Sequence, residues 1–229
     1  MSDYSFAGAG TVPGGEYDNV SVSGSGKGTG DIRCKNFKAS GSFGGTYNLY
    51  CSEELKVAGA FKCGGNIKAG YVNASGAFKC EKSLKAEKIK ISGAVGVGND
   101  IEGDTVNING SLNCGGLVNA ENFNLEHDGF SNIGSIGGSN IQIKSSGSRT
   151  TFKLINLFRK NSEFGRVTVE ESIEGDVVTL EYVDAPKVVG RVVVIGKGCN
   201  IGSLVYSESA EISPDAKVKN CEQDQLMLP

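Results

Sequence analysis

Histidine and cysteine are the residue types in this chain best suited to acid–base, nucleophilic or metal chemistry. His127 is the only histidine among 229 residues, so any reaction that needs an imidazole as general base must use it. Seven cysteines occur, but none of them forms a CxxC pair, whereas zinc sites usually combine paired cysteines with histidines. We therefore expect no catalytic residue, no metal site and no cofactor.

Two glycine-rich strings resemble motifs of enzymes. The first, GSGKGTG (24–30), is similar to a phosphate-binding loop, but Lys27 is followed by Gly28 instead of Ser or Thr, and no helical pattern comes next. The second, IGKGCNIGS (195–203), is similar to two hexapeptide units of left-handed β-helix acyltransferases. Acyl transfer by His127 is therefore the enzymatic alternative. Against this alternative, only two such units occur, and the main repeat of this chain is slightly shorter than three hexapeptide units.

That main repeat consists of glycine-centred segments of one type. They are VSVSGSG (20–26), FKASGSF (37–43), LKVAGAF (55–61), VNASGAF (72–78), IKISGAV (89–95) and VNINGSL (106–112). Their central glycines, Gly24, Gly41, Gly59, Gly76, Gly93 and Gly110, recur every ~17 residues, and a fixed period of this kind is typical of stacked repeats. A seventh copy begins at Phe123, but His127 occupies its glycine position, which predicts a corner where the regular coil stops.

The pattern inside one repeat predicts three short strands and three corners. In the copy at Gly76, apolar or small residues alternate with polar ones at Val72, Ala74, Phe78, Cys80, Leu84 and Ala86. A period of two indicates strands, and the glycine suits a corner because it has no Cβ. One such unit cannot bury its own core, so neighbouring coils must cover it. The sequence predicts a single-stranded, triangular parallel β-helix.

The cysteines fit this repeat as small core residues. Cys63, Cys80 and Cys114 share one repeat position, and Cys34 and Cys51 share another, at which later copies carry Ala69, Ala86, Gly103 and Ala120. Exchange with alanine and glycine favours packing over chemistry.

The repeat also divides the chain. We expect an N-terminal segment or first coil at 1–19, a regular β-helix at 20–144, an irregular insertion at 145–166, further coils at 167–219 and a C-terminal tail at 220–229. Strand-like runs at 176–182, 188–195, 203–207 and 216–218 predict two or three coils after the insertion. Nine or ten coils at a strand spacing of about 4.8 Å would make a rod of roughly 45 Å.

With this alignment the chain resembles the bactofilins, a family of polymer-forming bacterial cytoskeletal proteins, especially their longer Gram-positive form. The six repeats, the junction IGGSNIQIK (136–144) and the closing stretch EGDVVTLEYVDAPKVVGRVVVIGKGCNIGSLVYSESAEISPDAKV (174–218) carry the resemblance, which covers nearly the whole chain. It implies a right-handed β-helix that polymerises end to end without nucleotide and sometimes docks on membranes. The insertion at 145–166 departs from the family pattern and raises the question of whether the rod is continuous.

Composition and charge agree with a cytoplasmic protein. The formal net charge is −3 with a pI near 5.4, which gives no general attraction to nucleic acid or anionic lipid. No signal-like or membrane-spanning apolar stretch is present, and an odd number of cysteines is unlike a disulfide framework. The expected partner is the protein itself as a homopolymer, with a membrane surface or envelope-associated proteins as further partners and no nucleic acid.

The insertion contains RTTFKLINLFRK (149–160), which forms an amphipathic pattern. Phe152, Leu154, Ile155, Leu157 and Phe158 cover one side of a helical wheel, and Arg159 and Lys160 add basic charge. This segment could pack against the flank of the rod, dock on a membrane or form a groove for a partner.

The ends and flanks of the rod are the predicted assembly surfaces. Each end of a β-helix presents an unpaired strand edge, and the apolar residues expected there are Phe6, Val12, Tyr17, Ile212 and Val218. Eight lysines lie between 53 and 90, and six acidic residues with no Lys or Arg lie between 91 and 143. Neighbouring rods could therefore pair basic band with acidic band. A rod that does not polymerise, and instead docks partners as an adaptor, is the remaining alternative.

Overall fold

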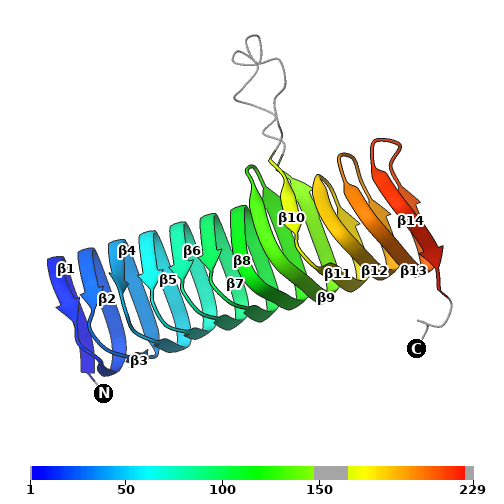
Figure 1. Ribbon diagram of the computed structural model, residues 1–229. Helices are drawn as coiled ribbons and strands as arrows, with labels where there is room; N and C mark the ends of the chain where they lie inside the picture. Colours follow the sequence, from blue (N-terminus) through cyan, green and yellow to red (C-terminus); the bar gives the residue numbers. More distant parts are fainter. Residues whose placement is uncertain (1, 147–164, 225–229) are drawn as a thin grey trace, which may run out of the picture.

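A computed structural model describes residues 2–146 and 165–224. Within these two ranges all regular structure is β-strand, and the fourteen strands form one parallel sheet that winds into about 12 stacked turns. The turns follow one another in sequence order, so the two termini lie at opposite ends of an elongated rod (Figure 1). The predicted parallel β-helix is confirmed. The strand register does not fix its hand, which stays a prediction.

Most strands bend around the rod and cover more than one of its sides. Their bounds are β1 Ser2–Val12, β2 Gly15–Gly28, β3 Ile32–Cys34, β4 Asn36–Gly45, β5 Leu49–Cys63, β6 Ile67–Cys80, β7 Leu84–Val97, β8 Ile101–His127, β9 Ser131–Ser145, β10 Val167–Val169, β11 Ser172–Leu180, β12 Val183–Ile195, β13 Asn200–Ile212 and β14 Lys217–Gln223.

Each regular turn has three faces, as the burial pattern shows. In the turn that contains β6, the alternation of buried and exposed residues is interrupted near Gly70, near Gly76 and at 81–83. We call the runs between these corners face 1 (67–69), face 2 (72–75) and face 3 (77–80), and we use the same names for equivalent residues of other turns. All six predicted core positions of this repeat are buried (Val72, Ala74, Phe78, Cys80, Leu84 and Ala86).

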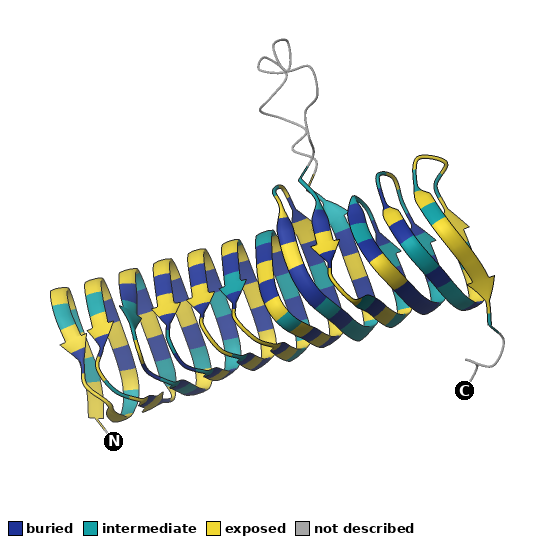
Figure 2. Cartoon of the chain, in the orientation of Figure 1, coloured by how far each residue is buried: buried dark blue, intermediate teal, exposed yellow. Residues whose placement is uncertain are grey.

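The core consists of ladders of equivalent side chains. Phe43, Phe61 and Phe78 lie above one another on face 3, with ring centroids 6.1 and 5.3 Å apart and interplanar angles of 20° and 13°. Parallel in-register strands place equivalent residues one strand spacing apart, so like side chains stack. Figure 2 shows buried residues recurring from turn to turn along the rod.

Glycines form a continuous corner between faces 2 and 3. The six predicted glycines are in register, and Gly8 adds a further member below Gly24. All of them have φ between 90° and 131°, which favours glycine. We refer to this stack as the glycine corner. Because Gly8 belongs to it, the N-terminal segment is a coil of the rod.

The regular repeat stops at His127, as predicted. β8 ends there. In the regular turns Val97 pairs with Cys114, which is 114 − 97 = 17 residues later. Cys114 itself pairs with Ile133, which is 133 − 114 = 19 residues later, so the turn that contains His127 is longer. Phe130 lies in the widened corner with 65% of its surface exposed, a feature that the sequence reasoning missed.

The rod is continuous across the insertion. Residues 147–164 lie outside the described residues, yet β9 pairs directly with β10 and with β11, for example Ile141 with Val178. The question that the insertion raised is therefore answered in favour of continuity.

The C-terminal turns have a looser spacing than the regular ones. Ile173 pairs with Val188, Val188 with Leu204, and Leu204 with Cys221, so the first two of these steps are shorter than the regular repeat. The four predicted strand-like runs all fall largely on β11 to β14. The rod has more turns than the nine or ten predicted, because the N-terminal segment is itself a turn and the C-terminal turns use fewer residues. No helix of the described residues is long and apolar enough to cross a membrane.

Candidate functional site: the two ends of the rod

Aromatic side chains cover the N-terminal end. β1 pairs with β2 and with no other described strand, so its outer edge is open. The Tyr4 ring lies 6.4 Å from the ring of Phe6 and 5.5 Å from that of Tyr17, and all three pack partly buried on the core. The hydroxyl of Tyr4 donates to the carbonyl of Thr11 at 2.8 Å. This end therefore presents apolar surface, and the Tyr4 hydroxyl within it is already paired.

Of the three residues predicted for this end, two lie in the end layer and one does not. Phe6 and Tyr17 belong to the end layer, whereas Val12 is fully buried and cannot contact another molecule directly. Tyr4 was missed by the sequence reasoning. Its register with Val20 gives it an inward position, and extending the repeat alignment to Gly8 would have found it.

The C-terminal end is a second open edge. β14 pairs with β13 and with no other described strand, and nearly all of its residues are exposed (Figure 2). Ile212 has 39% of its surface exposed, and Val218 is partly buried against the core. Both residues belong to the last turn, one at the end of β13 and the other in β14. The N-terminal and C-terminal sets lie at opposite ends of one chain (Figure 1), so only two chains can bring them together.

The cysteines on the repeat are core residues, as predicted. Cys34, Cys51, Cys63, Cys80, Cys114 and Cys199 are buried, and Cys221 is exposed. Burial raises the pKa of Cys63 to about 12 and that of Cys114 to about 11. Both thiols are therefore protonated near neutral pH, and a protonated thiol is a poor nucleophile.

His127 is fully buried at the widened corner. Its Nδ1 lies 3.4 Å from the carbonyl oxygen of Gly129, and its Nε2 has no hydrogen-bond partner among the described residues. The acyl-transfer alternative would require this imidazole to reach a substrate, which its burial opposes.

The two glycine-rich strings lie in strands and a turn of the rod. Lys27 of the string 24–30 lies within β2, paired in register with Thr11 and Gly44, and Gly24 serves the glycine corner. Within 195–203, a turn at 196–199 joins β12 to β13. The predicted docking residues Phe152, Leu154, Ile155, Leu157, Phe158, Arg159 and Lys160 lie outside the described residues. In the described part of the chain, no three or more His, Cys, Asp or Glu side chains gather as a metal site.

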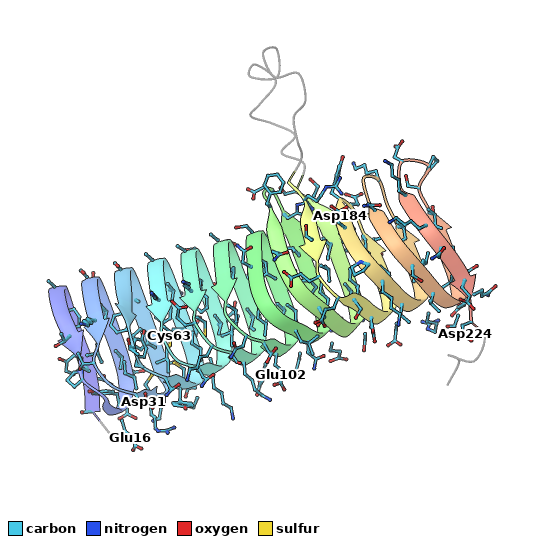
Figure 3. All side chains as sticks on the ribbon, viewed as in Figure 1. Glu16, Asp31, Cys63, Glu102, Asp184 and Asp224 are labelled. Atoms are coloured by element: carbon cyan, nitrogen blue, oxygen red, sulfur yellow. The ribbon has the colours of Figure 1, made fainter. Side chains whose placement is uncertain are left out.

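Ion pairs engage some of the charged side chains of the two bands. Glu81 pairs with Lys62 at 3.0 Å and with Lys79 at 3.1 Å, and Lys85 of the basic band pairs with Glu102 of the acidic band. In Figure 3, Glu16 and Glu102, which occupy equivalent positions on face 1, both project from the lower edge of the rod. The bands are therefore partly neutralised within one chain, and all of these side chains remain exposed.

No family model matches the chain, and no solved structure matches it. The chain is similar to the uncharacterized protein YhbF of Bacillus subtilis (strain 168), with 36% identity over 95 residues, which are 42% of this chain and 35% of YhbF. The match thus spans about a third of the length of that relative.

Proposed function

We propose that the protein is a cytoskeletal scaffold of the bactofilin type, which assembles with itself into filaments by end-to-end stacking of its β-helices and needs no nucleotide. One observation carries the proposal: the two terminal strands, β1 and β14, each have a single described neighbour and adjoin partly exposed apolar residues. The proposed location is the cytoplasm, with the segment 149–160 as a membrane or partner attachment.

The chemistry of an open strand edge supports stacking. A row of backbone N–H and C=O groups without partners is a template for another strand, and burying apolar side chains beside it contributes about 25 cal/mol for each Å² removed from water. The first and the last turn belong to one parallel sheet, so a turn of a second molecule would continue that sheet in the same strand direction. Stacking would extend the same ladders that hold one chain together.

Electron microscopy of the purified protein without nucleotide tests the proposal. We expect filaments from the wild type and none from Ile212→Arg or Val218→Arg, because an arginine would place a charge in the apolar contact. Ile212 is the cleaner position because it is more exposed, so its substitution disturbs the fold less. Circular dichroism and thermal unfolding would verify that each variant is folded.

Leu117→Arg is the matched control. Leu117 is 38% exposed, almost the same as Ile212 at 39%, but it lies in the middle of the rod on β8. Its substitution should leave filaments intact. Filaments that persist in both C-terminal variants would rule out stacking through that end, and a wild type whose mass by light scattering is that of a monomer at every concentration would favour the adaptor.

A further inference from the structure

Cys34 and Cys51 form a thiol pair at the floor of a surface groove on face 1. They are directly paired in register on β3 and β5, and their Sγ atoms are 3.6 Å apart. Both cysteines line a groove of about 550 Å³, together with Arg33, Lys35, Tyr50 and Lys68. The side chains are 7% and 3% exposed, so the pair is covered by protein yet lies next to solvent.

A second in-register pair, Cys63 and Cys80, differs in its partners. The thiol of Cys63 donates to the carbonyl of Tyr47 at 3.0 Å, and that of Cys80 donates to the carbonyl of Gly65 at 3.3 Å. Each of these thiols is occupied by the backbone of a neighbouring turn and has no exposed surface. The thiols of Cys34 and Cys51 contact each other instead.

Both basic and acidic side chains line the groove that the Cys34–Cys51 pair adjoins. The guanidinium of Arg33 lies 4.3 Å from the centre of the Tyr50 ring, and Lys35 pairs with Asp18 at 2.8 Å. Lys68 is a further cation in the lining, which also includes Glu16 and Glu87. The contact with the Cys34 thiol, together with burial, raises the pKa of the Cys51 thiol above its ordinary value of 9.0, so a group that binds this pair through sulfur must displace the thiol protons.

We propose that Cys34 and Cys51 bind one soft monovalent metal ion, Cu(I), between their sulfur atoms. Thiolates select such ions over harder cations. Binding breaks two S–H bonds, releases the two protons to solvent and forms two Cu–S bonds. Copper enters and stays as Cu(I), so no electron is transferred. The bound unit carries one net negative charge.

The geometry favours a bridging ion over a disulfide. A metal–sulfur bond of about 2.3 Å puts two sulfurs on opposite sides of one ion about 4.6 Å apart, so the sulfurs at 3.6 Å must separate by about 1 Å. A disulfide needs an S–S distance of about 2.05 Å and Cβ atoms about 3.8 Å apart. To form that bond the two sulfurs would have to approach by about 1.5 Å, a larger displacement than the bridging ion requires.

Anaerobic titration of the full chain with Cu(I), with bicinchoninate as the coloured competitor, tests the proposal. The background is Cys221→Ser, because this exposed thiol could bridge two chains. We expect one equivalent of Cu(I) per chain, an ultraviolet thiolate-to-copper absorption and a higher unfolding temperature. Cys34→Ala and Cys51→Ala should each lose all three signals. Both should fold, because Ala69 and Ala86 occupy the same ladder in the following turns.

Cys80→Val is the matched control, because Val97 follows Cys80 in register, and it should retain the bound equivalent. The proposal is overturned if the parent chain competes for Cu(I) no better than Cys34→Ala, or if Cys80→Val abolishes binding instead. It is also overturned if oxidised glutathione joins Cys34 to Cys51 while Cu(I) does not bind, since the pair would then be a redox site.

Discussion

At the scale of single residues, the glycine corner is the strictest requirement of this fold. A Cβ added at Gly76 would lie 2.3 Å from the carbonyl oxygen of Gly59, and the φ of Gly76 is 109°. Two independent causes therefore select glycine, namely the backbone conformation and the close approach of the turn below. Each cause recurs at every member from Gly24 to Gly110, which is why the repeat is so visible in the sequence.

Gly76→Ala should consequently destabilise the rod. We expect a loss of about 1–3 kcal/mol in the free energy of unfolding from the backbone conformation alone, and more from the contact with Gly59. Gly96→Ala is the control, because its added Cβ would meet only the side chain of Lys79 at 3.7 Å, an ordinary contact. Urea unfolding of both variants measures the difference, and equal stability of the two would contradict this account.

At the scale of elements, polar side chains tie the turns together at the corner between faces 3 and 1. Asp31 accepts a hydrogen bond from the backbone N–H of Asn48 at 2.9 Å, and Asn48 accepts one from that of Asn66 at 2.9 Å. Farther along the same corner, Asp100 accepts from the N–H of Leu117 at 2.9 Å. At this corner the backbone N–H groups of these residues do not take part in the ladder between strands. Side-chain oxygens of the preceding turn accept their hydrogen bonds instead.

This ladder makes part of the stability depend on pH. The hydrogen bonds from the backbone and side chain of Asn48 lower the pKa of Asp31 below its ordinary value of 3.8. A carboxylate with a lowered pKa in the folded state stabilises that state above pH 3.8 and loses this effect as the pH falls through the folded-state pKa.

Asp31→Asn should therefore cost stability at neutral pH, and its difference from the wild type should shrink as the pH falls below 3.8. Urea unfolding across this range measures the difference. In an Asn48→Ala background, Asp31→Asn should have a smaller effect at neutral pH, because the side-chain hydrogen bond that helps to lower the pKa is gone. A wild-type advantage that grows on acidification would refute the assignment.

At the scale of the whole molecule, charge is divided along the rod. The lysines between 53 and 90 and the acidic residues between 91 and 143 are exposed, and Lys85 and Glu102 pair across the boundary between the two bands. If filaments form, neighbouring filaments that are shifted or reversed along their axes would place basic band against acidic band.

Salt should then separate bundles without breaking filaments. The screening length falls from about 10 Å at 0.1 M salt to about 3 Å at 1 M, which weakens contacts between exposed charges, whereas the apolar contact at the rod ends does not depend on charge. Electron micrographs at the two salt concentrations measure this. Filaments that dissolve into single rods together with the bundles would contradict the separation of the two interfaces.

The sequence by itself determined the coil, its three faces and the six core positions of the copy at Gly76. It could do so because the in-register contacts between turns of a solenoid join equivalent residues. The repeat length along the chain therefore also tells which residues pack on one another in neighbouring turns. The same rule identified Phe6, Tyr17, Ile212 and Val218 as terminal residues, and it placed five of the seven cysteines in the core.

Only the tertiary structure decided which terminal residues are accessible and which thiols meet. Val12 is buried while Tyr4 lies in the end layer, although one unbroken register pairs them with Gly28 and Val20 of the next turn. Cys34 contacts Cys51 while Cys63 and Cys80 contact carbonyls, although both pairs are in register. These contacts depend on the direction of each side chain and on the backbone conformation of the neighbouring corner. The repeat length predicts neither of them.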